Sequence, residues 1–298
     1  TPEDEDDAVA QGGVAFLDGT VYASTGYGEV VALEAANGAI RWRRQVGTPI
    51  HAGPTVATGV VVVVTLDNEV VALSTASGEP LWQYAGLSRP SALLGGSAPA
   101  IDAGTVVAGL TSGELVAFTA TGGALLWTDS LLAFRRLGAL ADLSDIRGRP
   151  VIDRGLVLAM SSSGRLAALD LISGGRLWER SIGGVDSPWI AGNYVFVISN
   201  DMQLICLSRA SGRIRWVTQL RQFEDEADRE DRILWTGPIL VSDRLIVAGS
   251  HGVALALSPY TGEPLGQIKL PGPVYVSPVV ADGWVYFLTD SADLVAYR

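Results

Sequence analysis

A segment of thirteen residues that recurs along the chain constrains the fold more than any other feature. Its first copy runs from Val30 to Trp42, and Asn37-Gly38 separates two mainly apolar runs in it. Asn-Gly in such a position is a strong signal for a tight β-hairpin. Further copies start at Val70, Leu115, Leu166, Leu204 and Ala254, and a seventh starts at Leu294. A repeated strand–turn–strand unit predicts an array of small stacked β-sheets.

The spacing of the copies indicates the size of each sheet. An anchor residue in the first strand of each copy lies 38 to 51 residues from the next, close to the length of a four-stranded propeller blade. About fourteen residues before each anchor a further strand begins, and in six copies a Pro precedes that strand. A Pro at the first residue of a strand costs no ladder hydrogen bond. The sequence therefore predicts an all-β protein, a β-propeller of four-stranded antiparallel blades with seven visible repeats. The anchors are Leu33, Leu73, Phe118, Leu169, Leu207, Leu257 and Tyr297.

A tryptophan closes five of the copies, and Gly266 stands in its place in the sixth. We expect each indole to wedge between neighbouring blades and its N–H to donate to a backbone carbonyl. The alternative, stacking on a ligand, is less favoured because the residues recur at one position in five repeats. The tryptophans are Trp42, Trp82, Trp127, Trp178 and Trp216.

The uniform repeat favours one domain over residues 1–298 rather than two. Residues 1–9 form an acidic leader without a strand pattern, which we interpret as solvated. Residues 128–149 form a long inter-blade connection with apolar residues three apart and several arginines. That pattern indicates a short helix or an ordered loop, either packed on the blades or facing a partner. Residues 221–232 are dense in charges of both signs, which is typical of a solvated loop.

Composition excludes several function classes. The net charge of −11 argues against a nucleic-acid partner. No run of eighteen apolar residues occurs, so we expect no transmembrane helix. Cys206, the only cysteine, cannot form an internal disulfide and is interpreted as a buried apolar filler. His51 and His251 are too few for a zinc cluster. Without a nucleophile elbow, P-loop or dinucleotide motif, the sequence predicts no catalytic residue, metal or cofactor, and not an enzyme.

The repeat, which approximates A-L-x-x-x-[NTS]-G-x-x-x-W, resembles the quinoprotein-type propeller repeat. Two families share it: the pyrroloquinoline-quinone dehydrogenases and the BamB family of outer-membrane assembly lipoproteins. The dehydrogenases are much longer and typically use an adjacent Cys pair, which one cysteine rules out. Similarity to BamB covers essentially the whole chain. It is most specific in Leu93 to Pro99, Leu143 to Ile152, Ala167 to Gly183, and the closing VVADG and LVAYR segments.

This resemblance implies an eight-bladed ring whose last blade is completed by an N-terminal strand. On that comparison this chain holds blades two to eight, and we expect that the first blade, the closing strand and a lipid anchor have been removed upstream. The implied function is a monomeric, non-enzymatic scaffold in the periplasm, at the inner face of the outer membrane of a Gram-negative bacterium. It would assist the folding and insertion of outer-membrane β-barrel proteins.

The resemblance also implies the partner and its contacts. The partner would be the POTRA domains of BamA, the insertase, and nascent β-barrel strands could also add to exposed blade edges. The family's contact groups lie on two loops. They fall here on Ser91, Leu93 and Leu94 of the first loop and on Asp145 and Arg147 of the second. From the composition of the second loop we add Arg135 and Arg136 as candidate partner-binding residues.

The chain departs from the family at three of these positions. Leu94 stands where the family has Arg, Arg147 where it has an acidic group, and Ser91 where it has Leu. These departures predict that the charge pairing is rewired at the same location. Two other hypotheses remain: a quinone-dependent dehydrogenase and a propeller that binds a ligand in its central channel.

Overall fold

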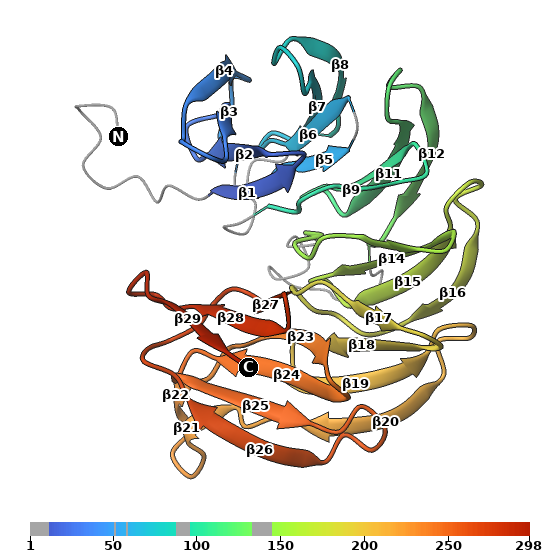
Figure 1. The fold of residues 1–298 in the computed structure, drawn as a ribbon. Helices are drawn as coiled ribbons and strands as arrows, with labels where there is room; N and C mark the ends of the chain where they lie inside the picture. Colours follow the sequence, from blue (N-terminus) through green and yellow to red (C-terminus); the bar gives the residue numbers. More distant parts are fainter. Residues whose placement is uncertain (1–11, 51, 58, 88–95, 133–144) are drawn as a thin grey trace. The chain divides into compact units, whose positions relative to one another are not determined.

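The computed structural model describes residues 12–50, 52–57, 59–87, 96–132 and 145–298. Within these ranges the regular elements are β-strands, which confirms the predicted all-β class (Figure 1). None of the described residues forms a helix that could cross a membrane. The chain divides into two compact units, residues 1–176 and 177–298, and each is described by itself. The single domain expected from the uniform repeat remains a prediction.

Unit 1 holds the first three blades and most of the fourth. Each blade is an antiparallel meander whose strands pair in chain order. The fourth blade continues into β16 (Arg176–Arg180), which begins at the boundary of the unit. The other strands are β1 (Gly12–Leu17), β2 (Thr20–Thr25), β3 (Glu29–Glu34), β4 (Ile40–Gln45), β5 (Thr55–Ala57), β6 (Val60–Val64), β7 (Glu69–Ser74), β8 (Pro80–Ala85), β9 (Ala100–Asp102), β10 (Thr105–Gly109), β11 (Glu114–Thr119), β12 (Leu125–Ser130), β13 (Val151–Asp153), β14 (Leu156–Ser161) and β15 (Arg165–Asp170).

Unit 2 holds two four-stranded blades and a sheet of three strands, β27, β28 and β29. A separate hairpin, β21 and β22, lies between the two four-stranded blades in the sequence. The seven predicted repeats thus all appear as blade sheets in the described residues. The strands are β17 (Trp189–Ala191), β18 (Tyr194–Ile198), β19 (Gln203–Ser208), β20 (Ile214–Gln219), β21 (Phe223–Asp225), β22 (Glu230–Arg232), β23 (Trp235–Val241), β24 (Arg244–Gly249), β25 (Val253–Leu257), β26 (Pro264–Lys269), β27 (Val279–Ala281), β28 (Trp284–Leu288) and β29 (Leu294–Tyr297).

The middle strands of the blades carry the core. All five residues of β6 are buried, because each face of this strand packs against a neighbouring sheet. On one face Val62 joins Val106 and Phe118 of the third blade, and on the other Val61 and Val63 join the first blade. A single four-stranded sheet cannot bury both faces alone, so the blades stabilise one another by stacking.

The predicted place of the prolines is confirmed in five blades and wrong in one. Pro54, Pro99, Pro150, Pro188 and Pro278 each directly precede the first strand of a blade. Pro238 instead lies inside β23. The pairing of β23 with β24 is irregular between Thr236 and Ile239, at the residue that has no N–H to donate. An interrupted ladder is where a strand tolerates a proline.

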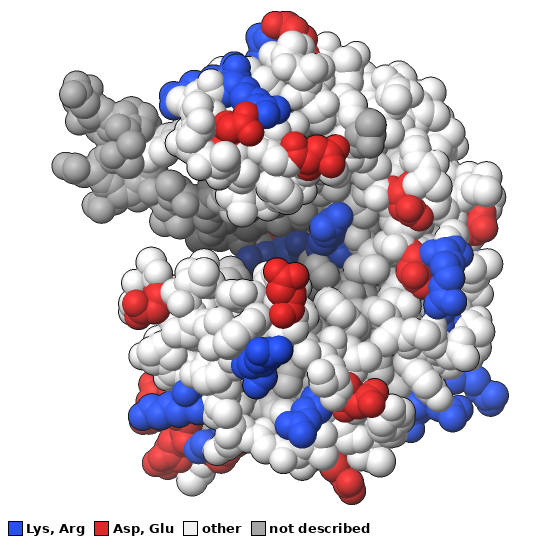
Figure 2. Space-filling view, viewed as in Figure 1, with Lys and Arg blue, Asp and Glu red and all other residues white. Residues whose placement is uncertain are grey.

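The long connections differ in how much of them is described. Within 128–149, residues 128–130 belong to β12, residues 133–144 lie outside the described ranges, and the described part contains no helix. Within 221–232 the charged segment forms the β21–β22 hairpin, and the Arg229 guanidinium lies 5.4 Å from the centroid of the Phe223 ring. All of β22 is exposed, and Figure 2 shows basic and acidic side chains gathered over this region.

The predicted role of the tryptophans is confirmed at all five positions. Each indole N–H donates to a backbone carbonyl in the turn of the following blade, at distances from 2.7 to 3.1 Å. Trp42, Trp127 and Trp178 are buried, and Trp82 and Trp216 are half-buried. The acceptors are the carbonyls of Thr75, Ala120, Leu171, Arg209 and Pro259.

Each indole packs closely against the turn glycine of the next blade. A Cβ added to any of these glycines would overlap the preceding tryptophan; at Gly174 it would lie 2.5 Å from Cγ of Trp127. The glycines also have φ from +62° to +76°, a conformation that other residues rarely adopt. Turn geometry and close packing therefore both require glycine here. The residues are Gly78, Gly123, Gly174, Gly212 and Gly262.

Cys206 lies in β19 and is almost completely buried, which confirms its interpretation as an apolar filler. Burial raises the pKa of its thiol to about 11.

The thiolate is the reactive form, and the pKa of a free cysteine is about 8.5. At pH 8 we expect Cys206 in the folded chain to react with a disulfide reagent slower by on the order of a hundredfold than in guanidinium. Equal rates in the two states would contradict this.

Candidate partner-binding surface

The two loops that carry the predicted contacts are described only at their ends. Ser91, Leu93 and Leu94 lie outside the described residues, as do Arg135 and Arg136. Asp145 and Arg147 are described. The anchor points of each loop in unit 1 can therefore be examined. We call residues 88–95 loop A and residues 133–144 loop B.

Asn68 holds the start of loop A. Its side chain is completely buried, and its amide Nδ2 donates to the carbonyl of Leu87 at 2.7 Å. Its Oδ1 accepts from the backbone N–H of Thr111 at 2.8 Å and from the Thr111 hydroxyl at 2.9 Å. One amide thus joins loop A to both the second and the third blade. A buried amide with these partners satisfied fixes one geometry.

Loop B is anchored at both ends by buried residues. Before it, Leu131 donates its N–H to Gly113 O at 2.8 Å and accepts from the Ser161 hydroxyl at 2.9 Å. After it, the carbonyl of Asp145 accepts from Ser162 N–H at 3.0 Å. The side chain of Ile146 is buried in the cluster that joins the third and fourth blades. These contacts pin the ends of loop B to two blades.

A direct hydrogen bond joins the segments that follow the two loops. The hydroxyl of Ser97, which is buried two residues after loop A, donates to the carbonyl of Gly148 at 3.1 Å. Gly109 of β10 lies against Ile146 on one side, and a Cβ there would overlap Ile146 Cγ2. Loops A and B therefore leave unit 1 from adjoining anchors on the second, third and fourth blades, which follow one another in Figure 1.

The two described contact residues have different surroundings. The Asp145 side chain is completely buried, whereas Arg147 is half-buried. In this structure Asp145 belongs to the anchor of loop B, and Arg147 is the charged group of the pair that reaches solvent. The sequence did not predict a role for Asn68, Ser97 or Ser161. The sequence did hold a signal for Asn68, because this residue occupies the turn position that Gly113 holds in the next blade. The structure gives Asn68 a φ of +63°, a conformation that asparagine adopts more readily than most residues.

The described residues contain no group of three or more His, Cys, Asp or Glu side chains that could hold a metal ion. His51 lies outside the described ranges. His251 packs edge-on against Trp235, with ring centroids 5.0 Å apart. Burial lowers the pKa of His251, Glu224 partly offsets this, and Arg221 lowers the pKa further. This places His251 in a packing role beside the β23 strand.

Comparison with known families identifies the family to which the repeat belongs. A family model described as "Outer membrane protein assembly factor BamB" matches residues 4–218, which is more than half of the chain. The chain belongs to the BamB family. This confirms the family resemblance drawn from the repeat. Among curated members, the BamB of Yersinia pestis is 28% identical over 292 residues, covering 97% of this chain and 72% of the relative. The BamB of Escherichia coli K12 is 29% identical over 278 residues, covering 93% and 68%.

Solved structures share the fold. The crystal structure of BamB from Moraxella catarrhalis superposes with a TM-score of 0.87 at 24% identity, covering 97% of this chain and 85% of that one. A quinohemoprotein alcohol dehydrogenase from Comamonas testosteroni gives a TM-score of 0.70 at 14% identity, covering 94% and 62%. At these identities both comparisons establish the propeller fold and nothing about chemistry.

Proposed function

We propose that this BamB-family chain is a non-enzymatic scaffold of outer-membrane protein assembly in the periplasm, at the inner face of the outer membrane. It binds the POTRA domains of the insertase BamA through loops A and B and thereby assists the insertion of β-barrel proteins. Family membership supports a role in outer-membrane protein assembly, since the curated relatives are named outer membrane protein assembly factors. The Ser97–Gly148 hydrogen bond, which couples the anchors of the two loops, is the observation that carries the site.

The composition of the loops suits a docking surface. Leu93 and Leu94 supply apolar area that becomes buried on binding, which is the main source of affinity at the centre of an interface. Arg135, Arg136 and Arg147 make this region basic in a chain whose net charge is −11. The matching partner surface is therefore acidic, and the charges set orientation and association rate.

The rigid anchors lower the cost of binding. Association is weakened by every loop and side chain that must become ordered. Asn68, Leu131 and Ile146 are buried and hold the loop ends in place before any partner arrives. Preorganised ends mean that less free energy is lost when the loops dock.

A calorimetric titration of the chain with the POTRA domains of its cognate BamA tests this proposal. We expect saturable binding that a Leu93→Glu/Leu94→Glu variant weakens by about a hundredfold or more, because two apolar contacts of a hot spot are lost. The matched control is Ile172→Glu, since Ile172 is 84% exposed in the β15–β16 turn of the same unit. Circular dichroism verifies that each variant is folded. Equal affinity of the double variant and the control would overturn the proposal.

A further inference from the structure

Leu87 is an exposed leucine that lies directly before loop A. It is 67% exposed and follows the end of β8 by two residues. The other large apolar residues that are exposed among the described residues of unit 1 lie in β1, in the fourth strands β4, β8 and β12, or in the β15–β16 turn. Of this exposed set in unit 1, Leu87 alone lies in a connection between two blades.

This connection is at the end of the blades from which both loops leave. In an antiparallel meander, the connections after the second and fourth strands lie at one end, and those after the first and third strands lie at the other. Loops A and B follow the fourth strands β8 and β12. The exposed Ile172 follows a third strand, β15, and therefore lies at the opposite end.

Two hydrogen bonds to one buried residue fix the backbone of Leu87. The N–H of Gly86 donates to the backbone carbonyl of Asn68 at 2.9 Å, and the Asn68 amide donates to the carbonyl of Leu87 at 2.7 Å. A Cβ added to Gly86 would lie 2.6 Å from Cδ1 of Leu110, so the chain here packs directly on the third blade. Leu87 thus has a fixed backbone and an exposed side chain.

The same contacts reach the anchor of loop B. The carbonyl of Leu110 accepts from the N–H of Ile146 at 3.3 Å. The next residue, Thr111, donates its N–H and its hydroxyl to the Asn68 side chain. Leu87 is therefore joined to the ends of both loops through one buried network in unit 1.

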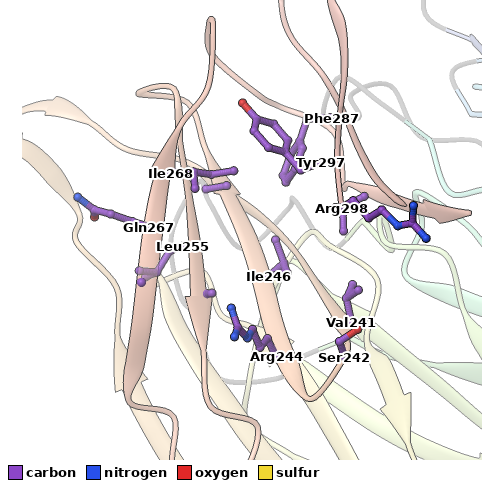
Figure 3. Close-up of a pocket in the computed structure, with 14 residues that line it drawn as sticks. Val241, Ser242, Arg244, Ile246, Leu255, Gln267, Ile268, Phe287, Tyr297 and Arg298 are labelled. Atoms are coloured by element: carbon purple, nitrogen blue, oxygen red, sulfur yellow. The ribbon is translucent and has the colours of Figure 1, made fainter. Parts of the chain in front are cut away.

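Exposed apolar residues of unit 2 have a different setting. Ile268 and Tyr297 are 40% and 37% exposed and line a cavity of about 560 Å³ between the β23–β26 blade and the β27–β29 sheet (Figure 3). A single exposed leucine is ordinary on a protein surface. Leu87 differs from these residues in two respects, because its backbone is held by a buried amide and because it adjoins loop A.

We propose that Leu87 is a preorganised apolar contact for BamA, positioned by Asn68, and that it enters an apolar pocket of a POTRA domain. The proposal rests on the proposed function and adds a contact that lies outside loops A and B. Binding removes the exposed apolar area of the leucine from water. The backbone of Leu87 is already ordered, so little conformational entropy is lost on docking.

Protection of a thiol at position 87 tests the contact. Cys206 is the only cysteine and is buried, so a Leu87→Cys variant carries one accessible thiol. We expect saturating POTRA domains to slow its reaction with a disulfide reagent by about tenfold or more, because the thiol becomes inaccessible. Leu81→Cys is the matched control, since Leu81 is 46% exposed in β8 of the same blade. Its reaction rate should not change.

Calorimetry tests the role of Asn68. Leu87→Ala changes an exposed side chain, folds as the parent does, and should weaken POTRA binding by about tenfold. Asn68→Gly suits the φ of +63° and removes the side chain that holds Leu87. If Asn68 acts by positioning Leu87, Asn68→Gly should weaken binding by a smaller factor in the Leu87→Ala background than in the parent. A purely structural role would give the same factor in both backgrounds.

The outcomes separate this proposal from the proposed function. An unprotected thiol at position 87, in a chain whose binding Leu93→Glu/Leu94→Glu weakens, would overturn the Leu87 contact and leave the proposed function standing. Equal factors for a folded Asn68→Gly in both backgrounds would overturn the positioning role. No saturable binding of POTRA domains by the parent chain would overturn both proposals.

Discussion

Replacing Trp127 with Ala is expected to lower the free energy of unfolding of unit 1 by about 3–5 kcal/mol. Trp127 is buried in the cluster that joins the third and fourth blades, together with Leu131 and Leu169. Truncation opens a large cavity there and leaves the Leu171 carbonyl without its indole donor. Guanidinium denaturation followed by circular dichroism measures the change.

A matched control lies on the same strand. Leu125 of β12 is exposed, so Leu125→Ala should change the free energy of unfolding by no more than about 0.5 kcal/mol. The reciprocal variant Gly174→Ala should also be destabilising, because its Cβ would lie 2.5 Å from the Trp127 ring and its φ is +69°. A loss below about 1 kcal/mol for Trp127→Ala would show that the indole does not hold the blades together.

Gly109→Ala is expected to destabilise unit 1 by about 1–3 kcal/mol, because the core at this point has no room for a methyl group. Its Cβ would overlap Ile146, the buried residue that anchors the end of loop B, and would also approach the Ser97 hydroxyl. Displacing Ile146 should disturb both loop anchors, so the affinity for the POTRA domains should fall as well. Denaturation and calorimetry measure the two effects separately.

A double-mutant cycle isolates the clash. Ile146→Ala removes Cγ2, the atom that the new methyl group would meet at 2.4 Å, and leaves only the Cβ contact at 2.9 Å, at a cost in stability of its own. The double variant Gly109→Ala/Ile146→Ala should then be more stable than the sum of the single effects predicts, since the two residues are in contact. Strict additivity would mean that the two residues do not constrain each other.

The repeat period and the turn chemistry sufficed to predict the blades and the hydrogen bonds of the tryptophans. Both are local patterns that return at a fixed offset, so each copy confirms the others. The packing of the indoles against glycines such as Gly174 was not predicted. The positive φ of a tight turn is already sufficient to explain a glycine there. The close contact with the tryptophan is a second reason for glycine, and it depends on the neighbouring blade.

The candidate site was predictable only in part. Loop composition drew attention to Leu93 and to the arginines of loop B, and the family resemblance added Asp145. The burial of Asp145 depends on packing that a single sequence does not display. The Ser97–Gly148 bond joins residues 51 positions apart in different blades, and no local pattern marks such a pair.

We propose that loops A and B of this BamB-family chain contact BamA. Site-specific photo-crosslinking in Gram-negative cells that produce the cognate BamA tests this contact most directly. A photoreactive phenylalanine analogue is placed at position 93 or 147, and, as controls, at the exposed residues Ile172 of unit 1 and Tyr260 of unit 2. We predict BamA adducts from positions 93 and 147 and none from the controls. Adducts from the control positions alone, or no adduct from a folded chain, would contradict the claim.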